Sequence, residues 1–310
     1  MRFLDARAVA ALGPAAAVQA ITKALQGGVD PAADPARVSV DLTKGQFLLM
    51  PSETSTAAGV KVVTVAPDNP SRGLPRIQAA YLLFDRDTLT LRAVLDGTAL
   101  TTLRTPAVSV AAVLERLPDH GLRVAVIGAG PQATGHVSTL AAVRPLQEAT
   151  YLVRDPARTP FNAAALGSSQ AGEALRAADV VVCATSARSP VFDSALLRDD
   201  AVVVAVGSHE PDARELDARL LGNATVVVED VATAQREAGD VILAIAEGTL
   251  TPEDLVPMRD VLTGAVDAPT DRPLVFKERR DVLAGPRRRR GRPGTQRRLT
   301  VHPARRSNTH

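Results

Sequence analysis

A short glycine-rich run follows an apolar stretch near the middle of the chain. It reads Gly128-Ala129-Gly130-Pro131-Gln132-Ala133, a G-x-G-x-x-A spacing, and it stands between RVAVI and a helical pattern. The first glycine permits a tight turn, the second lets the backbone approach a pyrophosphate, and the alanine keeps the helix close to the sheet. The helix that begins there presents N–H donors to an anion. We predict that these six residues bind a dinucleotide; an ordinary strand–helix turn is the alternative.

The end of the next apolar stretch bears on the choice of cofactor. TYLV ends in Val153-Arg154-Asp155, where NAD-binding chains usually place a carboxylate for the ribose hydroxyls. Arg154 suits a 2′-phosphate, and Asp155 comes one residue late for the ribose contact. NADPH is therefore favoured over NADH, with a solvated loop arginine as the alternative. Thr185 and Gly207, which follow two later strands, complete the predicted cofactor-binding residues.

A parallel sheet is needed to bring these residues to one edge. After Pro118 the sequence alternates helical stretches with short, Val-rich strands: RVAVIG, ATYLVR, ADVVVCAT, AVVVAVG and ATVVVED. Continuous apolar runs of this kind are typical of parallel strands covered on both faces. We predict a doubly wound Rossmann sheet in the second half of the chain.

The first half has a different pattern. Residues 1–26 are predicted to form two short helices, with Pro14 at a first helical position and Gly27–Gly28 ending the second. Strand-like runs separated by Gly and Pro turns extend from Arg37 to about Leu95. Apolar residues at spacings of three and four then predict a helix over 98–117. This half is predicted to be a separate, mostly antiparallel α+β module.

The fold class predicted for the whole chain is α/β, a Rossmann sheet plus an N-terminal α+β domain. The expected boundaries are 1–118 for the N-terminal domain and 119–265 for the Rossmann domain. Residues 266–277 are expected to return toward the N-terminal domain, and 278–310 to form a basic tail.

Composition narrows the class of protein. Hydrophobic residues make up 45% of the 310 residues and aromatics 3%, so the core must be built from Ala, Val and Leu. No apolar run approaches the roughly 20 residues that a membrane span requires. The single cysteine, Cys183, excludes a disulfide framework and a cysteine-based metal cluster. No metal site is predicted, and a cytoplasmic protein is expected.

The net charge of +2 hides an asymmetry. Residues 278–310 contain eleven arginines and two acids, whereas the other 277 residues hold 25 basic and 32 acidic side chains. Nucleic acid is therefore expected as a partner only through the tail. The tail is either a true basic arm or the product of a frame change in GC-rich DNA, because CGN arginine codons read one base later encode Ala, Val, Gly or Asp. A segment this charged is not expected to order itself.

Several stretches in order resemble the ornithine cyclodeaminase / mu-crystallin family across residues 1 to 277. They include Arg37, Met50-Pro51, GVKVVTVAPDNPSRGLP, LLFDRDTLTLRAVLDGTALTTLRT, IGAGPQA, VAVGSHEPDARELD, EAGDVILAIAEG and RPLVFK. The resemblance implies a Rossmann domain, an N-terminal domain that dimerises, and an active site for α-amino or α-imino acids between them. The family continues after Lys277 with a serine turn and a helix that this sequence lacks, which is expected to weaken cofactor binding and domain closure.

On this resemblance the substrate-binding residues fall on Arg37, Lys61 and Arg104. A guanidinium forks onto a carboxylate with two parallel hydrogen bonds, and Lys61 is expected to donate or relay a proton. A surface ion pair is the alternative for each residue. An alternative also exists for the local structure, because Thr105 is able to cap a helix that starts at Pro106 and so leave Arg104 in a loop.

His209 decides between the reactions of the family. Cyclodeaminases have an aspartate after the glycine turn, in the pattern G-G-D-x-P-G, whereas this chain reads Gly207-Ser208-His209-Glu210-Pro211-Asp212. An imidazole cannot replace a permanent anion near neutral pH. The resemblance therefore implies an NAD(P)H-dependent reductase of cyclic imino acids, with Lys61 and His209 as its catalytic residues. Ornithine cyclodeaminase, amino-acid dehydrogenase and a non-catalytic NADPH-binding protein are the alternatives.

Overall fold

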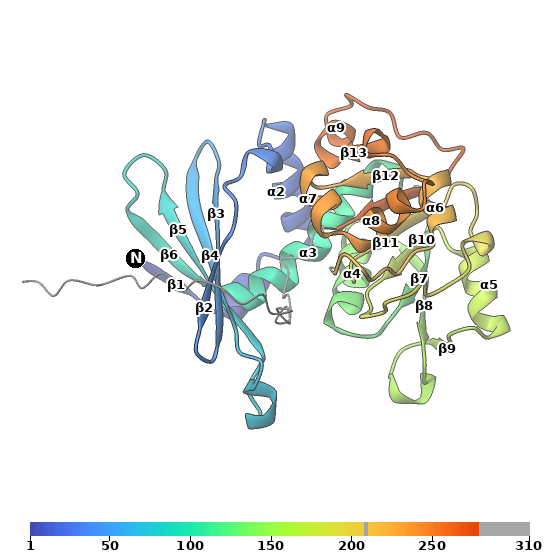
Figure 1. Ribbon diagram of the computed structural model, residues 1–310, viewed down its shortest axis with the longest axis horizontal. Coiled ribbons are helices and arrows are strands. Elements are labelled where there is room, and N and C mark those ends of the chain that lie inside the picture. The colour runs from blue at the N-terminus through green and yellow to red at the C-terminus, as the bar shows by residue number, and fades with distance from the viewer. Residues whose placement is uncertain (208–209, 279–310) are drawn as a thin grey trace, which may run out of the picture.

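The computed structural model describes residues 1–207 and 210–278 of the chain. Figure 1 shows a smaller sheet at the left, a larger sheet covered by helices at the right, and the helices α2 (Pro14–Gln26) and α3 (Gly97–Val113) between them. No helix in the described ranges is long and apolar enough to cross a membrane.

The N-terminal sheet has six strands in the order β1-β6-β5-β4-β3-β2. The pairs are antiparallel except β1 with β6, which is parallel. This confirms the mostly antiparallel module, although the chain begins with a strand where the sequence predicted a helix. The strand bounds are β1 (Arg2–Leu4), β2 (Val38–Leu42), β3 (Gly45–Glu53), β4 (Ala57–Val65), β5 (Ile77–Asp85) and β6 (Leu91–Asp96).

The alternating burial of the residues of β4 shows which face of this sheet is covered. Gly59, Lys61, Val63 and Val65 are buried, whereas the residues between them are half-buried. A strand points alternate side chains to opposite faces, so Lys61 lies on the covered face together with two core valines. Helix α3 packs against β4, β5 and β6, and α1 (Ala6–Ala10) packs against α3 and β6.

Helix α3 is continuous through its proline. Asp96 caps it by accepting a hydrogen bond from Ala99 N at 2.8 Å, and Pro106 lies inside it. The alternative of a helix that starts at Pro106 is therefore wrong, and Arg104 belongs to the helix. Proline removes one backbone hydrogen bond, but the turns that follow are almost fully buried in the core, which offsets that loss.

The second unit contains an eight-stranded sheet in the order β13-β12-β14-β11-β10-β7-β8-β9, with every pair parallel. This confirms the doubly wound sheet. The strands are β7 (Leu122–Ile127), β8 (Leu146–Val153), β9 (Ala163–Ala165), β10 (Val180–Cys183), β11 (Val202–Ala205), β12 (Thr225–Val228), β13 (Leu255–Pro257) and β14 (Leu274–Lys277). The helices of this unit are α4 (Pro131–Val143), α5 (Ser169–Ala177), α6 (Ala218–Asn223), α7 (Val231–Glu237), α8 (Gly239–Ala246) and α9 (Met258–Leu262).

Helices cover both faces of the parallel sheet. One core cluster combines α2, α3, α4 and α9 with the sheet, and the other combines α5, α6, α7 and α8 with its opposite face. The second half of α3 thus belongs to the Rossmann core although it precedes residue 118. Similarly, β14 lies between β11 and β12, so the end of the predicted return segment is a central strand. Its short run LVFK gave no periodicity that separates a strand from a linker.

A buried ion pair ties β14 to α8. Lys277 Nζ lies 3.2 Å from Asp240 Oδ2, and neither side chain is exposed. Lys277 Nζ also donates to Ala205 O at 3.3 Å. Asp240 Oδ1 accepts from Glu215 N at 2.7 Å and from Leu216 N at 2.9 Å. The pair therefore joins two strands, one helix and the loop before α6.

We expect Lys277→Met to destabilise the fold by about 3–5 kcal/mol, because it leaves the Asp240 carboxylate buried without its cation. The free energy of unfolding from chemical denaturation measures the effect. Lys277→Met combined with Asp240→Asn should recover part of the loss, and Lys44→Met in the exposed β2–β3 turn is the control. A Lys277→Met chain as stable as the control would contradict a structural role for the pair.

Candidate cofactor and substrate site

The glycine loop forms a tight turn at the carboxyl end of β7. Gly128 has φ +106°, and a Cβ there would lie 2.7 Å from Ala184 O. Glycine is the residue that tolerates this backbone conformation and this close approach. A Cβ at Gly130 would meet no atom within 4 Å, and Gly130 is the N-cap of α4. The loop thus leaves open space at a helix N-terminus, which fits a pyrophosphate.

A pocket of about 810 Å³ extends from this loop along the carboxyl edge of the sheet. The ends of β7, β8 and β10 meet there, as expected where parallel strands finish at one edge. Its lining includes four residues of the predicted cofactor site, Gly128, Ala129, Arg154 and Thr185. Of the other predicted residues, Gly130 caps α4, 131–133 begin that helix, and Gly207 follows β11.

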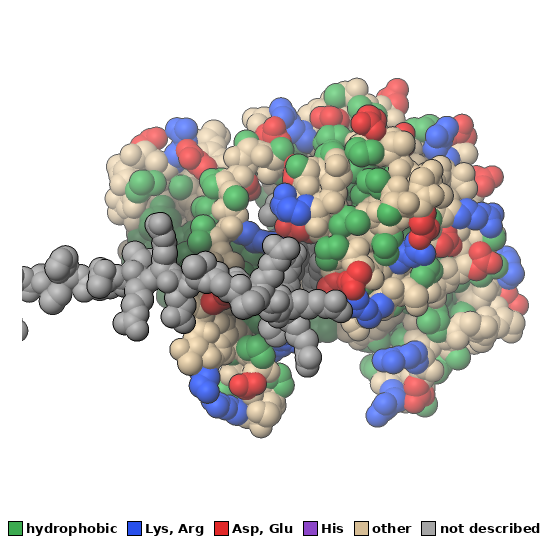
Figure 2. Space-filling view, viewed as in Figure 1, with side chains coloured by type: hydrophobic (Ala, Val, Ile, Leu, Met, Phe, Trp, Pro, Cys, Tyr) green, Lys and Arg blue, Asp and Glu red, His purple; other side chains and the backbone are tan. Residues whose placement is uncertain are grey.

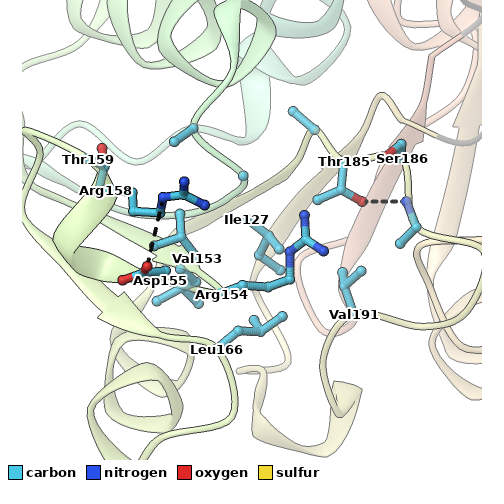
Figure 3. Close-up of a pocket in the computed structure, with 15 residues that line it drawn as sticks. Ile127, Val153, Arg154, Asp155, Arg158, Thr159, Leu166, Thr185, Ser186 and Val191 are labelled. Carbon is cyan, nitrogen blue, oxygen red and sulfur yellow. Dashed lines mark hydrogen bonds and ion pairs between the residues drawn. The ribbon is translucent and has the colours of Figure 1, made fainter.

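The β8 end of the pocket is cationic. Figure 3 shows the guanidinium groups of Arg154 and Arg158 extending into the pocket. The carboxylate of Asp155 instead accepts a hydrogen bond from Ala157 N at 3.2 Å and lies 4.0 Å from Arg158 Nε. Asp155 therefore caps its own loop, and the two arginines are placed to bind an anion.

Glu215, a buried carboxylate that was not predicted from the sequence, fixes the loop of Thr185 at the opposite side of the pocket. Glu215 Oε1 accepts from Thr185 N at 2.8 Å and from Thr185 Oγ1 at 2.7 Å, and Glu215 Oε2 accepts from Gly207 N at 2.6 Å. Burial raises the pKa of this carboxyl, against the effects of Lys277 and of the Thr185 hydrogen bonds. The signal in the sequence was an acid next to the apolar residues of the stretch ARELDARLL.

The same carboxylate explains the glycine at position 207. A Cβ at Gly207 would lie 2.0 Å from Thr185 O and 2.5 Å from Glu215 Oε1. No side chain fits there, so the two loops after β10 and β11 are held at a fixed separation. His209, the predicted catalytic residue of the second loop, lies outside the described residues.

Two predicted substrate residues reach from the N-terminal half to the Rossmann unit. Arg37 Nη2 lies 2.8 Å from Glu237 Oε1 of α7. Arg37 Nη1 is buried without a hydrogen-bond partner among the described residues. Arg104 Nη1 lies 3.6 Å from Glu278 Oε1, at the end of β14. Both guanidinium groups are therefore paired with acids across the junction of the two units.

Lys61, the third predicted substrate residue, is only 8% exposed. Its neighbours in register are Met50 on β3 and Tyr81 on β5. Burial, followed by the charge of Asp34, raises the pKa of the Tyr81 phenol. An ammonium on a covered sheet face is largely removed from bulk water. Its interaction with an anion is therefore stronger than that of an ammonium at the surface.

Glu278 departs from the sequence prediction, which placed it in the solvated tail. Its side chain is fully buried, and Ser109 Oγ donates to its Oε2 at 3.2 Å. Residues 279–310, which carry the rest of the predicted tail, lie outside the described part of the chain. Among the residues that the structure does describe, no group of three or more His, Cys, Asp or Glu could hold a metal ion.

Comparison with known proteins identifies relatives of this arrangement. Residues 8–276 match the model of the ornithine cyclodeaminase/mu-crystallin family. A Δ1-pyrroline-2-carboxylate/Δ1-piperideine-2-carboxylate reductase from Azospirillum brasilense is 35% identical over 255 residues, which are 78% of each chain.

Solved structures agree with this relationship. Δ1-Pyrroline-2-carboxylate reductase from Thermococcus litoralis, in complex with NADH and L-proline, has a TM-score of 0.76 and 26% identity over 90% of this chain and 92% of its own. An archaeal alanine dehydrogenase dimer with bound NAD has the same TM-score and identity over 90% of each chain. The glycine loop, the paired arginines and these matches together show that the chain belongs to the ornithine cyclodeaminase/mu-crystallin family.

Proposed function

We propose that this protein is an NAD(P)H-dependent reductase of cyclic imino acids, which converts Δ1-pyrroline-2-carboxylate or Δ1-piperideine-2-carboxylate to proline or pipecolate. The observation that carries the proposal is the pocket at the glycine loop. Arg37, Lys61 and Arg104 lie outside its lining, and Arg37 and Arg104 reach acids of the second unit from the other half of the chain. A relative with 35% identity acts on both imino acids. A cytoplasmic location is part of the proposal, with which a single, buried cysteine is consistent.

The proposed reaction requires a group that binds the substrate carboxylate and a group that donates a proton to the imine nitrogen. When it is bound, the nicotinamide supplies the hydride that adds to the imine carbon. Arg104 and Arg37 bind the substrate carboxylate through charge-assisted hydrogen bonds, and the Lys61 ammonium donates its proton to the imine nitrogen. The covered sheet face excludes bulk water from Lys61 and keeps its orientation fixed, which favours the reaction entropically.

The structure gives less support to cyclodeamination, the main alternative. That reaction requires a carboxylate after the glycine turn, and the acids of this stretch that the structure describes are Glu210 and Asp212. Glu210 is hydrogen-bonded to Arg188, which also lies 2.6 Å from Asp212 Oδ2. Both acids are thus engaged by an arginine at the surface, which favours the reductase.

NADPH is the proposed cofactor. Arg154 and Arg158 provide two cations where the adenosine ribose would lie, and Asp155 is engaged in its own turn. We expect Arg154→Ala/Arg158→Ala to raise the dissociation constant of NADPH by about 10- to 100-fold, because one or two charge-assisted contacts are lost. The dissociation constant of NADH should change by no more than about twofold. Fluorescence titration with each nucleotide measures both.

The control for this pair is Arg176→Ala, an exposed arginine at the end of α5 outside the pocket lining. It should change neither affinity. Equal losses for NADPH and NADH in the double variant would show that the arginines do not recognise a 2′-phosphate, and the cofactor preference would have to be abandoned.

Lys61 provides a direct test of the proton step. We expect Lys61→Met to lower kcat for the imino acid by ~10²–10⁴-fold, the usual contribution of a positioned general acid, with the affinity for NADPH unchanged. Stopped-flow oxidation of NADPH measures the rate. Lys44→Met, on the exposed turn of the same sheet, is the matched control, and a wild-type rate in Lys61→Met would refute the assigned role.

A homodimer is the proposed assembly. Val38, Val40 and Leu42 on β2 and Phe47 on β3 are each 36–50% exposed on one face of the N-terminal sheet. Hydrophobic side chains also reach the surface over this sheet in Figure 2. An apolar face of this kind is typical of a protein interface, and a structural relative is a dimer.

We expect Val40→Asp to shift the protein from dimer to monomer in sedimentation analysis, because it places a charge in the apolar face. Ser39→Asp adds the same charge to the neighbouring residue, whose side chain points to the opposite face, and should leave the dimer intact. A Val40→Asp chain that sediments like the wild type would exclude this face as the interface.

A further inference from the structure

Glu278 lies where β14 leaves the sheet, beside an arginine assigned to the substrate. Its backbone N donates to Ala205 O at 3.1 Å, which continues the pairing of β14 with β11. The side chain is fully buried, and its Oε1 lies 3.6 Å from Arg104 Nη1 without a hydrogen-bond partner among the described residues. A carboxylate of the protein itself therefore faces the guanidinium that the proposed function gives to the substrate carboxylate.

A buried hydrogen-bonded chain keeps Glu278 in this orientation. Ser109 Oγ lies 3.2 Å from Glu278 Oε2, 2.9 Å from His136 Nε2 and 3.3 Å from Thr105 O, so these groups share its one proton. His136 Nδ1 is 2.8 Å from Gln132 O, and because a carbonyl can only accept, this nitrogen donates. The chain runs from α4 through α3 to the end of β14, so the position of Glu278 is set by the core.

The charges around Glu278 are mixed. Burial and, to a smaller extent, the Glu229 carboxylate raise the pKa of Glu278, which lies at about 8 when all its neighbours are counted. Arg104, Lys277 and the Ser109 hydroxyl act in the opposite direction. His136 reaches this acid only through Ser109. Glu278 is therefore predominantly neutral below pH 8 and predominantly an anion above it.

We propose that Glu278 is an internal competitor of the substrate: its carboxylate neutralises Arg104 and so weakens the binding of the imino acid carboxylate at the same guanidinium. This inference rests on the proposed function, because it takes Arg104 as the substrate anchor. Two carboxylates that share one cation repel each other, so the ionised form of Glu278 opposes binding and the protonated form permits it.

The direction of the pH effect follows from this. As the pH rises from 7 to 9, Glu278 loses its proton, and the KM of the wild-type chain for the imino acid should rise about tenfold relative to that of Glu278→Gln. The ratio of the two KM values at each pH cancels the titration of the substrate itself. Glu253→Gln, an exposed acid outside the site, is the charge-matched control and should follow the wild type.

The test is made on the full chain with NADPH present. We expect Glu278→Gln and Glu278→Ser to lower KM for Δ1-pyrroline-2-carboxylate at pH 9 by about tenfold. They should also lower the dissociation constant of L-proline, measured by calorimetry, in the same ratio. Using both variants guards against the misfolding of one, and thermal denaturation confirms that each is folded.

The outcomes separate this inference from the function on which it rests. Turnover of the imino acid with identical KM–pH profiles in wild type and both folded variants overturns the competitor role alone. Tighter L-proline binding in the variants without turnover in any chain supports the competitor and overturns the reductase. L-proline bound by none of the chains contradicts both.

Discussion

Charges that have no access to water organise the carboxyl edge of the parallel sheet. Lys277, Asp240 and Glu215 are all fully buried there. A buried ion is tolerable when a counter-ion and hydrogen bonds replace its hydration. Lys277 supplies the cation, and Asp240 accepts two backbone N–H groups of the segment that contains Glu215. Glu215 in turn accepts the N–H groups of Thr185 and Gly207. The positions of the loops that contain Thr185 and Gly207 therefore depend on the ion pair and the hydrogen bonds that compensate these buried charges.

Helix α3 connects the Rossmann unit, which holds the glycine loop, with the N-terminal sheet. It begins beside the N-terminal sheet and ends in the core of the Rossmann unit. Its contact with α4 is close enough that a Cβ at Gly135 would lie 3.0 Å from the Pro106 ring. Arg104 directly precedes the buried half of the helix, so its backbone is fixed by the same packing that holds the glycine loop. In its proposed role, an arginine on a rigid helix needs less ordering when it binds the substrate than one on a loop.

The elements with strong local signals were predictable from the sequence. The Val-rich strands, the glycine loop and the helix predicted over 98–117 are present, although α3 ends at Val113. Each pattern reflects burial or backbone geometry that the residue types themselves determine. Thr185 and Arg154 both line the pocket, since strand ends of a parallel sheet share one edge, and their role in binding a cofactor stays a prediction. The structure corrected the role of Pro106, where the packing of α3 against both units overrides a local helix-start signal.

The buried acids were beyond sequence reasoning for a different reason. Whether Glu215 or Glu278 is solvated depends on contacts with residues such as Thr185 and Arg104, which are far away in the chain. A charge beside an arginine-rich segment looks solvated when only its neighbours in sequence are considered. The run LVFK was equally ambiguous, because four apolar residues fit a linker and a central strand alike until the partners β11 and β12 are known.

The pairing of cations with acids has a consequence for recognition. Arg37 lies against Glu237, Arg104 against Glu278, and Lys277 against Asp240. Because Arg37 and Arg104 already lie against acids, the positive field of the proposed substrate site is weaker than its arginines suggest, so a carboxylate alone gains little by binding there. A ligand that brings a carboxylate and also a nitrogen able to take a proton can satisfy a cation and an acid together. For the proposed site, this compensation favours imino acids over simple carboxylic acids, because a ligand with one group leaves the other charge unpaired in a site of low dielectric.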